Sequence, residues 1–221
     1  MRIRNIIILT FLVCLGFSYN VNSQNSERFK EEVDKLVQKE YHFDADEPVV
    51  VFTGSSSIRM WKDIQEYFPD HNIINNGFGG STFADLLHFY QELILIRKPD
   101  ILFIYEGDND LIQTAPKEVI EVAKEVLSKV RKDLPETRIV LITPKPSISR
   151  WDLKSKYEEM NALLVQLAHQ TENVELANVW DAMLDSNGVV YQDVFLEDNL
   201  HMNKKGYDIW AKVMKEFLNP R

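Results

Sequence analysis

The chain alternates between short apolar runs and longer stretches in which apolar residues recur at every third or fourth position. The short runs are rich in β-branched residues, which is typical of strands covered on both faces. They are residues 48–54, 71–77, 100–107, 138–144 and 174–180, of which 71–77 is the weakest. The longer stretches predict amphipathic helices at residues 26–41, 81–96, 115–132, 156–170 and 203–218.

This order of elements predicts the class of fold. Strands separated by helices pair in parallel through right-handed crossovers, which places helices on both faces of the sheet. The chain is therefore predicted to form an open three-layer α/β/α domain with a five-stranded parallel sheet. Its 221 residues are enough to bury a core, and no repeat, low-complexity stretch or linker divides them.

The first residues follow a different pattern. Two arginines precede an apolar run over residues 6–17, and small or polar residues follow it. This layout is typical of a secretory signal peptide, and the run is shorter than the roughly 20 residues of a membrane span. Val21 and Ser23 fit the positions before a cleavage site. We predict a signal peptide over residues 1–23 and a catalytic domain over 24–221; an uncleaved N-terminal anchor is the alternative.

Composition then limits the partners and the location of the protein. The single cysteine, Cys14, lies in the apolar run, so the mature chain would have neither a disulfide nor a thiol nucleophile. Without residues 1–23, 23 basic residues face 34 acidic ones, a net charge of −11. Such a chain is a poor partner for nucleic acid or anionic membranes. We expect a periplasmic or extracellular protein without stable membrane insertion.

Residues that carry chemistry collect where the strands end. In open α/β sheets, ligands bind outside the carboxyl ends of the strands. Three serines, residues 55–57, follow the first strand, where serine is also a common helix cap. Asp198 and His201 stand three apart before the last helix, and a carboxylate at this distance can orient an imidazole. His201 is the one histidine with such a partner in a suitable loop.

Two further segments follow the second and third strands. The glycine-rich "NNGFGGST" exposes backbone N–H groups, and "GDND" offers the side-chain amide of Asn109. The first is an imperfect match to a dinucleotide fingerprint and stands on the second strand. Asp108 and Asp110 are too few for a calcium loop and are also routine turn residues. Together with Ser and His, these donors fit acyl transfer best.

At this point the chain resembles the SGNH hydrolases, or GDSL esterases, and in particular the branch similar to platelet-activating-factor acetylhydrolase. The blocks "FTGSSSIRMW", "NNGFGGST", "GDND" and "DNLH" occur in the family's order over nearly the whole mature chain. The resemblance implies a flavodoxin-like sheet, the catalytic residues Ser56, Asp198 and His201, and an oxyanion hole made by Ser56, Gly80 and Asn109. It implies no metal and no cofactor.

With the predicted signal peptide, the resemblance leads us to expect an exported serine esterase. No long insertion suggests a lid over a large lipid, so we predict short acyl esters as substrates, with acetyl esters of carbohydrate as the expected case. One position departs from the family: Ser55 stands where the family has Asp, so the choice among the three serines depends on alignment. The alternative is a non-catalytic glycan- or lipid-binding module. Near the site, Phe78, Phe83 and Trp151 either line a pocket or belong to the core, and Lys145 and Arg150 either meet an anionic group or are solvated.

Overall fold

The computed structural model describes residues 25–218. The predicted signal peptide lies outside this range, so it stays a prediction. None of the helices within the described residues combines the length and the hydropathy needed to cross a membrane.

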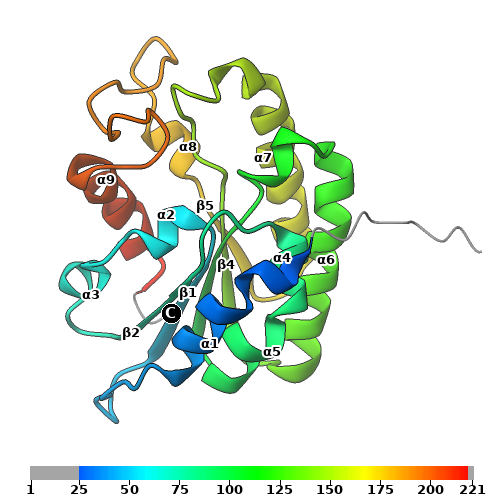
Figure 1. The fold of residues 1–221 in the computed structure, drawn as a ribbon, viewed down its shortest axis with the longest axis vertical. Helices are drawn as coiled ribbons and strands as arrows, with labels where there is room; N and C mark the ends of the chain where they lie inside the picture. Colours follow the sequence, from blue (N-terminus) through cyan, green and yellow to red (C-terminus); the bar gives the residue numbers. More distant parts are fainter. Residues whose placement is uncertain (1–24, 219–221) are drawn as a thin grey trace, which may run out of the picture.

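A parallel sheet forms the centre of the molecule, and its five strands run in the order β2-β1-β3-β4-β5 (Figure 1). The strands are β1 (Val49–Gly54), β2 (Asn72–Gly77), β3 (Ile101–Tyr105), β4 (Arg138–Ile142) and β5 (Val174–Ala177). All four pairings are parallel, which confirms the predicted fold class and the flavodoxin-like order. The chain order reverses between β1 and β3, so a ligand is expected beyond the carboxyl ends of these two strands.

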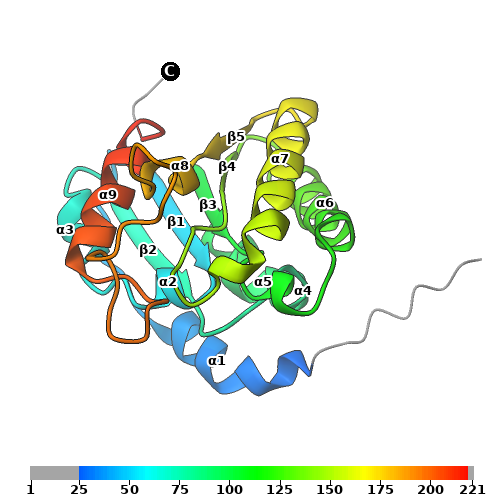
Figure 2. The same cartoon turned by 90° about the horizontal axis from the view of Figure 1, so that it is seen from above.

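Helices cover both faces of the sheet, as Figure 2 shows from above. One layer contains α1 (Lys30–Gln38), α4 (Phe83–His88), α5 (Tyr90–Leu93), α6 (Pro116–Asp133) and α7 (Lys154–Gln170). The other contains α2 (Ser56–Arg59), α3 (Ile64–Tyr67), α8 (Val179–Ala182) and α9 (Lys204–Lys215). Short 3₁₀ turns complete the chain: η1 (Ser26–Phe29), η2 (Leu95–Arg97), η3 (Asp110–Ile112) and η4 (Trp151–Leu153).

Two hydrophobic cores result from the alternation of side chains along the strands. In β1, Val51 packs toward the α6 layer while Val50 and Phe52 pack toward the α9 layer. In β3, Leu102 faces the first core and Phe103 the second. Every strand contributes side chains to both cores, so successive positions along the strands are apolar. This continuous apolar pattern is why the strands could be predicted from the sequence.

Several predicted elements differ from the structure at their bounds, and two of them show why. The helix expected over residues 81–96 is divided into α4, α5 and η2, since Phe89 has the non-helical dihedrals φ −97° and ψ 23°. The strand expected over 174–180 ends at Ala177. There Asn178 caps α8: its side-chain oxygen accepts the Asp181 N–H at 3.1 Å, a strong local signal for a helix start.

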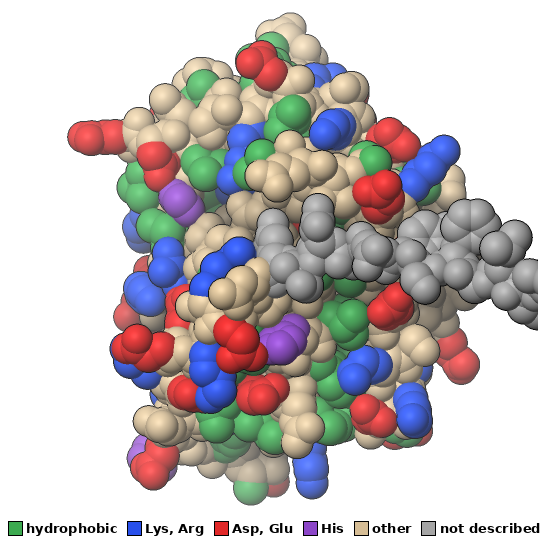
Figure 3. All heavy atoms as spheres, turned by 45° about the vertical axis from the view of Figure 1, so that its right-hand side comes forward, with side chains coloured by type: hydrophobic (Ala, Val, Ile, Leu, Met, Phe, Trp, Pro, Cys, Tyr) green, Lys and Arg blue, Asp and Glu red, His purple; other side chains and the backbone are tan. Residues whose placement is uncertain are grey.

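The surface carries charges of both signs. On the face shown in Figure 3, acidic and basic side chains are interspersed. Exposed ion pairs on α1 include Lys30–Asp34 at 2.5 Å and Lys35–Glu31 at 2.6 Å. Solvent screens exposed pairs of this kind, so they contribute little, and the stability of the fold depends mainly on the two cores.

Candidate active site

The turn after β1 is shaped by a close contact with β3. Gly54 has φ +122°, and a Cβ at this position would lie 2.0 Å from the carbonyl oxygen of Tyr105. Only glycine fits there. The Ser55 N–H donates to the same carbonyl at 3.0 Å, which brings the start of α2 to the carboxyl end of β3.

The three serines have different surroundings. Ser55 precedes α2 and is 2% exposed, and Ser57 is also 2% exposed, with its carbonyl accepting the Tyr207 hydroxyl at 3.0 Å. Ser56 is partly exposed, and its Oγ lies 3.0 Å from Nε2 of His201. Among the three, Ser56 is therefore the serine that contacts an imidazole.

Asp198 holds the other side of that imidazole. Its Oδ2 lies 2.5 Å from Nδ1 of His201, and its Oδ1 accepts the backbone N–H groups of Leu200 and His201 at 3.0 and 2.9 Å. Desolvation opposes ionisation, but these hydrogen bonds outweigh it and lower the pKa of Asp198 to about 2. With Nδ1–H donating to a carboxylate, Nε2 is free to accept the Ser56 proton.

Backbone donors for an oxyanion lie in two of the predicted segments. Gly80 has φ +70°, a conformation that glycine adopts without strain. Within residues 25–218, neither the Ser56 N–H nor the Gly80 N–H donates a hydrogen bond. The neighbouring Gly79 N–H is held by Glu32 Oε2 at 3.1 Å.

Asn109, which follows β3, links these two segments. Its Nδ2 donates to Ser55 Oγ at 2.7 Å and to the carbonyl of Ser81 at 2.9 Å. Ser55 precedes Ser56, and Ser81 follows Gly80. The amide therefore bridges the turns that carry both backbone donors, and the structure brings all five predicted site residues to one end of the sheet.

A buried ionic cluster lies behind Asn109, and the sequence did not reveal it. Asp108 is 4% exposed and accepts Arg150 at 2.5 Å, with Lys145 Nζ at 3.5 Å and the hydroxyl of Tyr157 also in contact. Burial opposes ionisation, but Lys145 and Arg150 outweigh it and lower the pKa of Asp108 to about 2. Both cations thus face a carboxylate of the protein itself.

Two more carboxyl groups are buried beside this cluster. Burial, with a smaller contribution from Asp110, raises the pKa of Glu106 well above its usual range. Glu106 accepts the Ser81 hydroxyl at 2.7 Å through Oε1. Burial also raises the pKa of Asp110 to about 7, against backbone N–H donors from Phe83 and Gly107. These carboxyls support the loop that carries Gly80 and Ser81.

The raised pKa of Glu106 predicts a pH-dependent gain from Glu106→Gln. The folded wild type keeps a proton that the unfolded chain releases above about pH 4.3, so wild-type stability falls as pH rises. Glutamine has no such proton. The variant's free energy of unfolding, minus that of the wild type, should rise by up to about 1.4 kcal/mol per pH unit until Glu106 ionises in the folded state. Urea denaturation from pH 5 to 8 measures this difference.

The exposed Glu125→Gln variant is the control for the loss of one negative charge. A Glu106→Gln difference that stays constant over this pH range would show that folding leaves the ionisation of Glu106 unchanged.

The aromatic residues near the site divide between core and surface. Phe78 and Phe83 are buried at 0% and 1% exposure and belong to the core. Trp151 is partly exposed and stacks on Trp180 with ring centroids 6.2 Å apart. Only Trp151 of the three remains a candidate for substrate contact.

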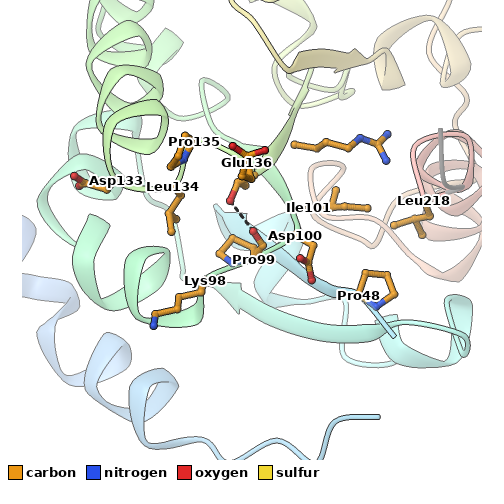
Figure 4. A pocket seen from close by; sticks show the side chains of 12 residues that line it. Pro48, Lys98, Pro99, Asp100, Ile101, Asp133, Leu134, Pro135, Glu136 and Leu218 are labelled. Carbon is orange, nitrogen blue, oxygen red and sulfur yellow. Dashed lines mark hydrogen bonds between the residues drawn. The ribbon is translucent and has the colours of Figure 1, made fainter. Parts of the chain in front are cut away.

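A separate hollow of about 670 Å³ lies at the opposite end of the sheet (Figure 4). It is lined by residues at the amino ends of strands, among them Pro48, Ile101 and Arg138, and by the loop around Pro135. Parallel sheets bind ligands at the carboxyl ends of their strands, and the Ser–His–Asp chain is there. We therefore place the candidate site at the carboxyl end.

Ser56, His201 and Asp198 lie in contact, in that order, at the carboxyl end of an open parallel sheet. The profile of the GDSL-like lipase/acylhydrolase family matches residues 47–209, and the chain belongs to this family. It is accordingly a hydrolase of carboxylic ester bonds. The family expected from the four sequence blocks is confirmed.

Solved structures support the fold. A Streptococcus pneumonia protein described as a platelet activating factor is 24% identical with a TM-score of 0.75, over 88% of this chain and 92% of that one. A Bacteroides fragilis protein described as an acylhydrolase is 18% identical with a TM-score of 0.69, over 88% of this chain and 96% of that one. An acetylxylan esterase from Geobacillus stearothermophilus is 16% identical with a TM-score of 0.66, over 79% and 95%. No curated protein matches the chain.

Proposed function

We propose that the protein is an exported serine esterase that removes short acyl groups, with acetyl esters of carbohydrate as its substrates. The observation that carries the proposal is the continuous chain from Ser56 Oγ through His201 to Asp198, with distances of 3.0 and 2.5 Å. A serine that is only capping a helix would not need an oriented imidazole at its hydroxyl.

In the first half of the reaction, Ser56 Oγ attacks the ester carbonyl and His201 Nε2 takes its proton. Asp198 stabilises the resulting imidazolium. The tetrahedral intermediate collapses when the leaving alcohol departs with the proton from His201. In the second half, His201 takes a proton from water as the water attacks the acyl-enzyme, which releases the acid and restores Ser56.

The negative charge on the intermediate would meet three donors: the N–H groups of Ser56 and Gly80 and the side-chain amide of Asn109. Both backbone N–H groups lack an acceptor within the described residues, so they can bind an oxyanion without breaking a bond. Preorganised donors of this kind act most strongly because they need no rearrangement during the reaction.

The substrate class is supported by two observations. The acetylxylan esterase shares the fold. Trp151, the first residue of η4, is partly exposed and offers a ring on which a sugar could pack. The test is a panel of p-nitrophenyl acetate, butyrate and octanoate together with acetylated xylooligosaccharides. We expect the highest kcat/KM on acetyl esters.

Higher kcat/KM on octanoate than on acetate would contradict the substrate class. Binding of acetylated oligosaccharide without turnover of any ester would instead favour a non-catalytic binding module. Export is tested separately, by the N-terminal sequence of the protein secreted from its host; the proposal expects the mature chain to begin at Gln24.

A further inference from the structure

The side-chain amide of Asn109 has all its hydrogen-bonding groups engaged. Nδ2 donates to Ser55 Oγ and to the Ser81 carbonyl at 2.7 and 2.9 Å, and Oδ1 accepts Nη2 of Arg150 at 3.0 Å. A side-chain amide can rotate by 180° and exchange the positions of its oxygen and nitrogen. A neighbouring group must therefore stabilise the orientation in which Nδ2 faces the site.

Arg150 favours one of the two orientations of the Asn109 amide. A guanidinium only donates hydrogen bonds, so it requires the oxygen end of the amide on its side. In the reversed orientation, Nδ2 would face the guanidinium donors and Oδ1 would face the carbonyl oxygen of Ser81. Both contacts would then be repulsive, which leaves the orientation with Nδ2 toward Ser55 and Ser81.

The guanidinium is itself held in place. Nη1 donates to Oδ1 and to the carbonyl of Asp108 at 2.5 and 2.8 Å, and the Arg150 side chain is 15% exposed. Asp108 in turn accepts the hydroxyl of Tyr105 at 2.8 Å and that of Tyr157. Arg150 therefore reaches Asn109 from a fixed, buried anchor.

We propose that Arg150 is a positioning residue for catalysis and that it acts through Asn109. It fixes the amide so that Nδ2–H points toward the oxyanion, and its positive charge makes that N–H a stronger donor. In the free enzyme, Ser55 Oγ accepts the N–H that would move to the oxyanion when substrate binds. This inference rests on the proposed function, in which Asn109 is an oxyanion donor.

The test is a double-mutant cycle of Arg150→Lys with Asn109→Ala, measured as kcat and KM on p-nitrophenyl acetate. One ammonium can neutralise Asp108 but cannot also hold Asn109 as the two-pronged guanidinium does. Arg150→Lys should lower kcat by about 10- to 100-fold with KM changed less than about threefold. Asn109→Ala should lower kcat by about 10²- to 10³-fold. In the Asn109→Ala background, Arg150→Lys should have almost no further effect.

Arg138→Lys is the matched control, because it replaces a partly buried guanidinium that pairs with Glu175 at 3.0 Å at the amino end of β4, away from Asn109. It should lower Tm and leave kcat within about threefold. Multiplicative losses in the cycle, or an equal loss of kcat in Arg138→Lys, would overturn the positioning role in favour of a purely structural one. If Arg150→Lys does not fold, Arg150→Gln is carried through the same cycle with the same expectation.

The two proposals fail in different ways. If Asn109→Ala alone keeps wild-type kcat, the oxyanion assignment in the proposed function is wrong. If Asn109→Ala loses activity as expected while Arg150→Lys lowers kcat equally in both backgrounds, only the role of Arg150 is wrong.

Discussion

Replacing Ser56 by alanine should lower kcat on p-nitrophenyl acetate by about 10⁴- to 10⁶-fold. The reason is that no acyl-enzyme can form without the hydroxyl that lies 3.0 Å from His201 Nε2. The donors on Ser56, Gly80 and Asn109 would remain, so a small acceleration over the uncatalysed reaction should survive. The measurement is steady-state kinetics, with circular dichroism to show that the variant is folded.

Ser55→Ala and Ser57→Ala are the matched controls, since all three serines belong to the same turn. Ser57→Ala should keep kcat within about threefold, because Tyr207 contacts the backbone carbonyl of Ser57 and not its side chain. Ser55→Ala should keep far more activity than Ser56→Ala. A fluorophosphonate that labels Ser55 or Ser57, or a Ser56→Ala variant with more than a tenth of wild-type kcat, would refute the nucleophile.

The fold was predictable from the sequence because its signals are local. Strands buried on both faces must be apolar at every position, and β-branched residues identify them without knowledge of their neighbours. The parallel order then follows from the helices between the strands. The boundaries were less predictable: Phe89 interrupts a helix whose apolar pattern continues unbroken through residues 81–96, and only the dihedral angles reveal the break.

The candidate site was predictable in part. Asp198 and His201 are close in sequence, so their contact could be expected from spacing. The serine could not be chosen this way, since Ser55, Ser56 and Ser57 are adjacent and only their direction in space distinguishes them. Contact of Ser56 with His201 spans 145 positions of the chain, and no local pattern encodes it.

The sequence left open whether Lys145 and Arg150 meet an anionic group or are solvated, and it did not identify Asp108 as their partner. Lys145 and Arg150 are charged residues in a loop, where side chains are commonly solvated. Here, however, Lys145 is 0% exposed and both residues face Asp108. Burial of a cation depends on what the rest of the fold places above it, and lysine is almost never buried without a partner. The charge of a loop residue alone therefore does not predict whether it is exposed or paired with a buried carboxylate.

Asp198→Asn should lower kcat by about 10⁴-fold, and the hydrogen bonds of the loop give the reason. Oδ1 is held by the backbone N–H groups of Leu200 and His201, so the amide of asparagine would keep its oxygen there and present NH₂ to the imidazole. Nδ1 of His201 must then accept, and the ring proton moves to Nε2. In this tautomer His201 cannot take the proton of Ser56.

A charge-matched variant distinguishes this cause from a simple loss of charge. With a pKa of about 2, Asp198 is ionised through the working range, so Asp198→Asn removes one negative charge there. Asp193→Asn, in the same loop and paired with Lys205 at 2.7 Å, removes an equal charge and should keep kcat within about twofold. If Asp198→Asn keeps more than a tenth of wild-type kcat, the carboxylate of Asp198 does not set the tautomer of His201. Residue 198 would then serve only to accept the two backbone hydrogen bonds of the loop.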